Sequence, residues 1–176
     1  MNIGFREYKV VRWWNYVDTE LEKPWRDLDR YVEGRLMEAR YEAELALKFL
    51  EAGLYRNAAG KAFQAVKALL AALAARHRDS LAQKYAGVRR LRDGRRVEYV
   101  DWLIAVVLTG LMLELARDLA AFEGGELVNY ANIALNLHEF QYKGLDRSGV
   151  LSRYARLDSV EEDVRALAGY VMGRVP

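Results

Sequence analysis

The amino-acid sequence predicts an all-α protein, an antiparallel up-and-down bundle of four main helices with a short fifth helix at the C-terminus. Three observations predict this class. The 176 residues are 52% hydrophobic and 30% charged, which is typical of a globular domain with its own core. The only prolines are Pro24 and Pro176, so more than 150 residues run without a helix-breaking ring. Apolar residues also recur every three or four positions over long stretches, which indicates helices.

The first predicted helix begins at Pro24, and a second begins directly after Gly53. Spacings of three and four positions relate the apolar residues of the first helix, which are Leu28, Val32, Leu36, Ala39, Ala43, Leu47 and Leu50. The second helix, Leu54 to about Arg78, is rich in alanine, and its polar residues form one narrow line. We therefore expect it to be buried on several sides, in an αα-hairpin with the first helix.

Residues 79–96 are predicted as a polar break with a turn at Asp93-Gly94. A third helix is predicted to extend from Val97 to Phe122, about 26 residues, because its apolar positions keep the helical period throughout. A pair of glycines follows and ends it. Its length matches that of the first helix, as expected for partners in a bundle.

The fourth predicted helix runs from Glu126 to Tyr142 and is closed by Gly144. After a loop, Ser159 and Glu162 have the spacing of a capping box, which predicts the start of the short fifth helix. We expect all of these helices to form one domain, residues 24–176.

Residues 1–23 are predicted to be an arm with two interpretations: a segment folded over the body, or an arm exchanged in a dimer. Trp13 and Trp14 make this arm apolar outside any clear helical stripe. Together with the alanine-rich helix, which lacks a broad polar face, they lead us to expect a homodimer.

Composition excludes several kinds of site. The chain has no cysteine, which excludes disulfides, thiolate zinc sites, iron–sulfur clusters and cysteine nucleophiles. Neither His77 nor His138 follows a glutamate at the spacing of a di-iron bundle, so we expect no metal site and no cofactor. The segment from Gly53 to Lys61 departs from a phosphate loop, and no serine lies in a nucleophile elbow.

The chain is also expected to be cytoplasmic, without a membrane partner. Its N-terminus lacks the pattern of a signal peptide. The longest charge-free stretch of the most apolar region, Trp102 to Leu113, has 12 residues, too few for a span. Rare glutamine and absent cysteine are a mild signature of thermophile proteins.

The clearest charge feature is the segment 76–96, which holds eight basic and two acidic residues. This segment carries a net charge of +6, while the rest of the chain carries −4. It is either a phosphate-binding face or a solvated loop whose arginines pair with acids on neighbouring helices. The candidate basic patch consists of Arg89, Arg90, Arg92, Arg95 and Arg96.

A second candidate is the start of the alanine-rich helix, where a helix N-terminus favours an anion. Asn57, Lys61 and Gln64 lie on one line, so we rank Lys61 first, with the other two as companions. Arg56 is peripheral because it lies on another side of the helix. The alternative is a junction network between helices.

The two histidines have mainly structural interpretations. His138, with Tyr142, joins the candidate site only if the fourth helix packs beside it; otherwise it is a hydrogen-bonded core residue. His77 lies at a helix C-terminus, where the helix dipole favours a positive imidazole.

Two stretches resemble a known family. Glu42 to Ala74, EAELALKFLEAGLYRNAAGKAFQAVKALLAALA, and Ala131 to Gly144, ANIALNLHEFQYKG, are similar to landmarks of the crenarchaeal PaREP-type family, grouped with HEPN-like helical domains. Pro24-Trp25 fits the usual start of that family, and the resemblance covers about residues 20–173. It implies an antiparallel bundle, often dimeric, with a central groove. HEPN-like relatives include nucleotide-binding partners of nucleotidyltransferases and RNA-cleaving toxins.

The ribonuclease branch of that superfamily uses an arginine four to six residues before histidine, and neither histidine here has one. We therefore expect a non-catalytic HEPN-like binding module, a dimer that binds a nucleotide, RNA phosphate or a partner protein such as a nucleotidyltransferase. The alternatives are a HEPN-type ribonuclease with an altered site around His138 and a purely structural scaffold.

Overall fold

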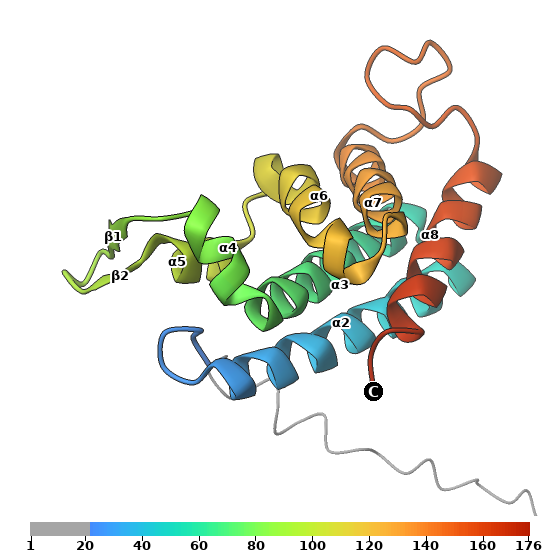
Figure 1. The fold of residues 1–176 in the computed structure, drawn as a ribbon. Helices are drawn as coiled ribbons and strands as arrows, with labels where there is room; N and C mark the ends of the chain where they lie inside the picture. Colours follow the sequence, from blue (N-terminus) through green and yellow to red (C-terminus); the bar gives the residue numbers. More distant parts are fainter. Residues whose placement is uncertain (1–21) are drawn as a thin grey trace, which may run out of the picture.

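A long central helix, α3, organises the computed structural model, which describes residues 22–176 (Figure 1). The elements in chain order are α2 (Leu28–Glu51), α3 (Tyr55–Arg76), α4 (Arg78–Lys84), β1 (Val88–Arg90), β2 (Arg96–Glu98), α5 (Tyr99–Val106), the 3₁₀ turn η1 (Thr109–Leu111), α6 (Met112–Glu123), α7 (Glu126–Lys143) and α8 (Leu157–Met172). The predicted all-α class is confirmed, apart from one short β-hairpin. The predicted arm, apart from its last two residues, lies outside the described residues.

Helix α2 begins later than predicted. The carboxylate of Asp27 accepts a hydrogen bond of 3.0 Å from the backbone N–H of Arg30, so Asp27 is the N-cap. Pro24 lies in a turn before the helix, and the prediction that Pro24 begins the helix is wrong. A side-chain acceptor for a first-turn N–H outweighs the preference of proline for a helix start.

The junction between α2 and α3 is a glycine C-cap, as predicted. Gly53 has φ +73°, and the N–H of Leu54 donates to the carbonyl oxygen of Phe49 at 2.8 Å. This bond spans the end of the helix and satisfies a carbonyl that has no partner within it. The helix therefore stops in a single residue, and α3 turns back along α2 (Figure 1).

Helix α3 is enclosed, which confirms the prediction for the alanine-rich segment. It packs against α2, α5, α6, α7 and α8, and 15 of its 22 residues are buried, so only a narrow strip meets solvent. Small side chains such as Ala65 and Ala68 allow this close approach of neighbouring helices. By length and composition α3 could cross a membrane, and α5 with α6 could do so if that bent pair were one span. However, 83% of the apolar window of α3 is buried, as in any core helix.

The single helix predicted from Val97 to Phe122 is wrong. It is broken into α5, η1 and α6, and the two halves meet at 105°. The break falls at Val107, which has φ +37° although it is β-branched and 2% exposed. β-branched residues and Gly110 weaken the helix in this stretch, and burial of Val107 in the core offsets the cost of its backbone conformation.

The predicted polar break contains regular structure, α4 and the two strands, that periodicity did not reveal. At the other end of the chain, α7 ends at Gly144 with φ +74°, as predicted. Helix α8 has 16 residues, so it is longer than the short helix that was predicted. The predicted capping box of Ser159 and Glu162 is wrong, because the helix begins before Ser159. Its N-cap is Arg156, and the carboxylate of Asp158 accepts a 2.8 Å hydrogen bond from the N–H of Ser159.

Candidate functional site

The arginines of the predicted basic patch lie on a β-hairpin that projects from one end of the molecule (Figure 1). The N–H of Leu91 donates to the carbonyl oxygen of Arg95 at 2.8 Å, and that of Gly94 donates to Leu91 at 3.1 Å. Gly94 has φ +86°, the left-handed residue that a three-residue hairpin loop requires. The turn predicted at Asp93-Gly94 is therefore confirmed.

The register of the hairpin puts two arginines directly opposite each other. Arg90 pairs with Arg96, and Val88 pairs with Glu98. Because the neighbouring pairs carry the backbone hydrogen bonds, Arg90 and Arg96 form a non-hydrogen-bonded pair, in which side chains approach most closely. Both are exposed, and neither has an ion-pair partner among residues 22–176. Like charges opposite each other destabilise a hairpin, so this face is suited to an anion.

The other face of the hairpin is attached to the body. Val97 is buried, and the guanidinium of Arg89 lies 4.7 Å from the ring centroid of Trp102 on α5. Tyr99 stacks beside Trp102 with ring centroids 5.6 Å apart. Arg89 therefore serves as a packing residue, while Arg90 and Arg96 point to the opposite face by strand alternation.

A buried ion pair anchors the base of the hairpin. Arg78 on α4 donates from Nε to Oδ1 of Asp101 at 2.7 Å and from Nη2 to Oδ2 at 3.1 Å. Arg78 also pairs with Glu98 of β2 at 2.8 Å. The hydrogen bonds to Asp101 raise the pKa of Arg78 above its ordinary value. This one guanidinium thus ties α4, α5 and β2 together.

Helix α4 is held at its other end by α6. Lys84 Nζ and Tyr85 OH each donate to a carboxylate oxygen of Asp118 at 2.6 Å. Burial, together with the contact to Asp118, raises the pKa of Tyr85. The hairpin therefore rests on a support fixed at both ends.

Within the basic patch, only the tip is partly neutralised by its own residues. The carboxylate of Asp93 accepts from the backbone N–H of Arg95 at 3.0 Å and from its Nε at 2.7 Å. Arg92, at the tip, is exposed and has no ion-pair partner among the described residues. The alternative, arginines that pair with acids on neighbouring helices, fits Arg78 but not the patch: Arg95 pairs within its own turn. The other four arginines of the patch have no acidic partner among the described residues.

At the second candidate site, the start of α3, the contacts are of the kind expected of a junction network between helices. Arg56 donates from Nε to the carbonyl oxygen of Gln141 at 2.8 Å and contacts that of Tyr142, so it caps the C-terminus of α7. Lys61 pairs with Glu42 of α2 at 2.8 Å. Asn57 and Gln64, the other two residues of the line, are exposed and have no such contact within residues 22–176.

Helix α7 does pack beside this line, which brings His138 and Tyr142 to it. The ring of His138 stacks on Phe63 of α3 at a centroid distance of 4.1 Å and meets the edge of Tyr142 at 5.2 Å. Burial, and then the charge of Lys67, lower the pKa of His138. Its Nδ1 is buried and has no partner among the described residues. The ring packs as a core residue would, but within residues 22–176 its Nδ1 lacks the hydrogen bond that the structural interpretation expects.

The sequence did not predict the cluster of polar contacts around Arg35 on α2. Arg35 donates from Nε to Tyr31 OH at 3.0 Å, from Nη1 to Glu38 at 2.7 Å and from Nη2 to the carbonyl oxygen of Ala105 at 3.0 Å. Burial, and then Arg35, lower the pKa of Lys67 on α3. The spacing of Arg35 and Glu38 on one helix is visible in the sequence, but their partners on other helices are not.

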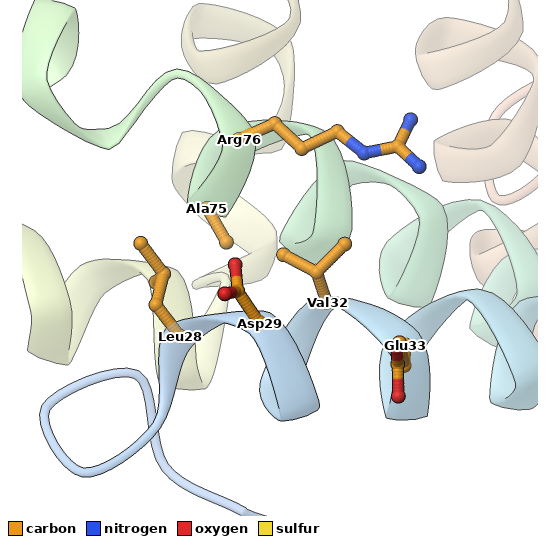
Figure 2. Close-up of a pocket in the computed structure, with 6 residues that line it drawn as sticks. All are labelled: Leu28, Asp29, Val32, Glu33, Ala75 and Arg76. Atoms are coloured by element: carbon orange, nitrogen blue, oxygen red, sulfur yellow. The ribbon is translucent and has the colours of Figure 1, made fainter.

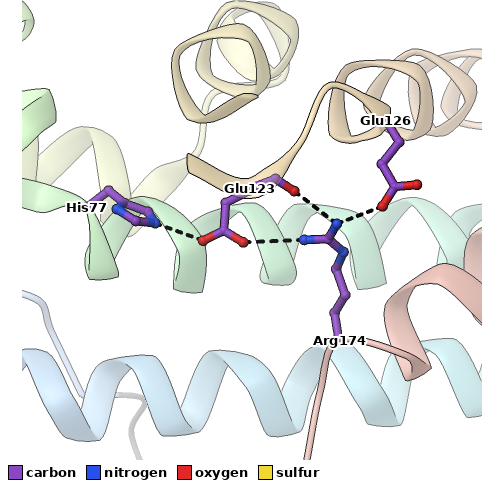
Figure 3. A network of polar contacts seen from close by, with 4 residues as sticks. All are labelled: His77, Glu123, Glu126 and Arg174. Carbon is purple, nitrogen blue, oxygen red and sulfur yellow. Dashed lines mark hydrogen bonds and ion pairs between the residues drawn. The ribbon is translucent and has the colours of Figure 1, made fainter. Parts of the chain in front are cut away.

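His77 belongs to a network that holds the C-terminus (Figure 3). Its Nε2 lies 2.7 Å from Oε1 of Glu123 at the end of α6. Arg174 contacts the other oxygen of Glu123 at 3.3 Å and pairs with Glu126 at 2.7 Å. The four side chains join α3, α6, α7 and the segment after α8, so His77 has a structural role beyond its helix end.

A hollow of about 520 Å³ lies between the start of α2 and the end of α3 (Figure 2). Its lining combines aliphatic side chains with two carboxylates and one guanidinium: Leu28, Val32, Ala75, Asp29, Glu33 and Arg76. None of these lining side chains is a histidine or carries a hydroxyl group.

These residues define the class of protein: a helical protein with an arginine-bearing hairpin and, over residues 22–176, no group of three or more metal-ligating side chains. Residues 34–165 match the archaeal PaREP1/PaREP8 family, and the chain belongs to this family. The family resemblance noted in the sequence is thereby confirmed. No curated protein matches the chain, and no solved structure matches it.

Proposed function

We propose that this protein is a non-catalytic binding module that holds nucleic-acid phosphates on its hairpin. The observation that carries this proposal is the pair of unpaired arginines, Arg90 and Arg96, on the outer face. In the free protein, repulsion between these two guanidinium groups destabilises the hairpin. A bound phosphate relieves the repulsion, because two guanidinium groups can hold one anionic group between them.

The support of the hairpin favours the same function. Backbone hydrogen bonds, the Arg89–Trp102 contact and the buried Arg78–Asp101 pair hold the two strands in place. The arginines are therefore presented on an ordered element, so less conformational freedom is lost on binding than from a flexible loop.

For the finer architecture, we propose a HEPN-like bundle of α2, α3, α7 and α8 that assembles as a homodimer in the cytoplasm. The mutual packing of α3 and α8 with both α2 and α7 supports this arrangement. Light scattering should then give a particle of about twice the chain mass of 20.2 kDa. A particle of the single-chain mass at micromolar concentration would contradict the dimer.

The proposed function is tested by fluorescence anisotropy with labelled RNA and DNA oligonucleotides at 50 and 200 mM salt. Binding should weaken steeply with salt, since each phosphate contact contributes a slope of about −0.7 to −0.9 in log K against log salt. The double variant Arg90→Gln/Arg96→Gln should lose about two such contacts, so it should bind more weakly and with a less steep dependence on salt. The matched control is Arg153→Gln/Arg165→Gln, which removes the same charge from exposed arginines on α8 and the loop before it.

Two results would overturn the proposal. Equal binding by the hairpin variant and the control variant would move the site away from the hairpin. Cleavage of the RNA during incubation would contradict a non-catalytic role and favour the ribonuclease alternative around His138. The Lys61 site stays a prediction, and calorimetry of Lys61→Ala with a nucleotide tests it separately.

A further inference from the structure

We propose that the hairpin binds double-stranded DNA, with its two strands lying in the major groove. This inference rests on the proposed function and names its substrate class. Three features of the hairpin lead to it: the shape of the ribbon, the composition of its outer face and the state of the aromatic rings beside it.

The shape of the hairpin fits a groove. Two antiparallel strands form a narrow ribbon about 5 Å between strand axes, and Figure 1 shows it projecting from one end of the molecule beyond α5. The major groove of B-form DNA, about 12 Å wide, admits a two-stranded ribbon. The tip carries Arg92, and the outer face carries Arg90 and Arg96, so positive charge extends along the ribbon.

The outer face is not purely basic. Val88 and Glu98 lie opposite each other on the same face as Arg90, at the end of the ribbon near the body. Val88 is 57% exposed, and the carboxylate of Glu98 is paired with Arg78. Arginine is the side chain that most often contacts guanine in the major groove, and aliphatic groups contact the methyl of thymine. An arginine face with an exposed aliphatic residue is therefore suited to base edges as well as to phosphates.

The aromatic rings beside the hairpin argue against a single strand as the preferred ligand. Single-stranded nucleic acids bind by stacking their bases on exposed rings. Here the ring of Trp102 is already contacted by Arg89 at 4.7 Å and stacked with Tyr99. Among the described residues next to the hairpin, these two rings serve the packing of the hairpin on α5.

Duplex RNA is disfavoured by its groove. The major groove of an A-form helix is deep and narrow, and side chains do not reach its base edges. The hairpin would then contact only backbone phosphates, so RNA duplexes should bind more weakly than DNA duplexes of the same sequence.

The experiment compares one 20-base-pair sequence as DNA duplex, RNA duplex and single strand, by fluorescence anisotropy with the full chain. We expect the DNA duplex to bind at least about 10-fold more tightly than either other ligand, the effect of one good groove contact. Arg90→Gln/Arg96→Gln should abolish this preference, whereas Arg153→Gln/Arg165→Gln should keep it. Circular dichroism checks that both variants retain the helical fold.

The outcomes separate the inference from the proposed function. Equal or tighter binding of the RNA duplex or the single strand, still dependent on Arg90 and Arg96, overturns the groove inference and leaves phosphate binding intact. Absence of binding to all three ligands overturns both. A preference for the DNA duplex that survives the hairpin variant also overturns the inference, because another surface must then supply it.

Discussion

Replacing Arg78 with methionine should destabilise the protein strongly and release the base of the hairpin. The side chain of Asp101 is only 7% exposed, and Arg78 supplies both hydrogen bonds to its carboxylate. Methionine keeps most of the apolar volume of the arginine stem but provides no donor. The carboxylate would then be buried without a positive partner, which is the costly part of breaking such a pair.

The expected magnitude follows from burial. Removing one partner of a buried ion pair costs about 3–5 kcal/mol. Arg78 itself is 22% exposed, and water can reach part of the site, so we expect about 3 kcal/mol, the lower end of that range. Its contact with Glu98, which is 61% exposed, adds little. For a chain of this size the change corresponds to a fall in Tm of about 6–12 °C.

Urea denaturation followed by circular dichroism measures this change in the free energy of unfolding. Arg92→Met is the matched control, since Arg92 is exposed at the hairpin tip and should change stability by less than about 0.5 kcal/mol. Arg78→Met/Asp101→Leu should recover part of the loss, because it leaves no buried charge. If Arg78→Met were as stable as the control, the ion pair would not hold the hairpin base.

Three further predictions concern the core, a histidine and a loop. Ala65→Leu should cost about 1–3 kcal/mol in urea unfolding because it overpacks the enclosed side of α3, whereas Gln64→Leu on the exposed strip should not. Because the pKa of His138 is lowered in the folded state, the unfolded chain takes up its proton more readily, so stability is full above pH 6.5 and is lost as pH falls towards the folded pKa. His138→Phe, which keeps a ring on Phe63, should remove that loss from a series of melting curves. The pKa of Asp146 is lowered to about 2, chiefly by hydrogen bonds from Ser148 and the N–H of Leu151, so its turn should persist at pH 3 and open as pH falls through 2; an NMR titration giving an ordinary pKa would contradict this.

Part of the candidate site was predictable because it is local in sequence. The basic residues of 76–96 and the turn at Asp93-Gly94 are visible without a structure, since a turn depends on a few adjacent residues. The pairing of Arg90 with Arg96 was not visible. It depends on strand register, which backbone hydrogen bonds between two short segments decide.

The ranking of Lys61 as the first candidate also shows that the sequence does not reveal contacts with distant residues. Helical spacing correctly put Asn57, Lys61 and Gln64 on one line. It carried no information about the facing helix α2, where Glu42 forms an ion pair with the ammonium group of Lys61. Long side chains are neutralised by residues distant in sequence, and only packing decides which ones.

The sequence by itself determined the helical class, the α2–α3 hairpin with its glycine C-cap, the enclosure of the alanine-rich helix and the family. These properties follow from apolar periodicity, from side-chain size and from glycine at a helix end, all of which are local. Only the tertiary structure decided that the third helix breaks at Val107 and that a basic segment becomes an ordered hairpin. Both depend on long-range burial: core packing offsets the strained backbone of Val107, and Trp102 and Asp101 fix the hairpin from elements that follow it in the chain.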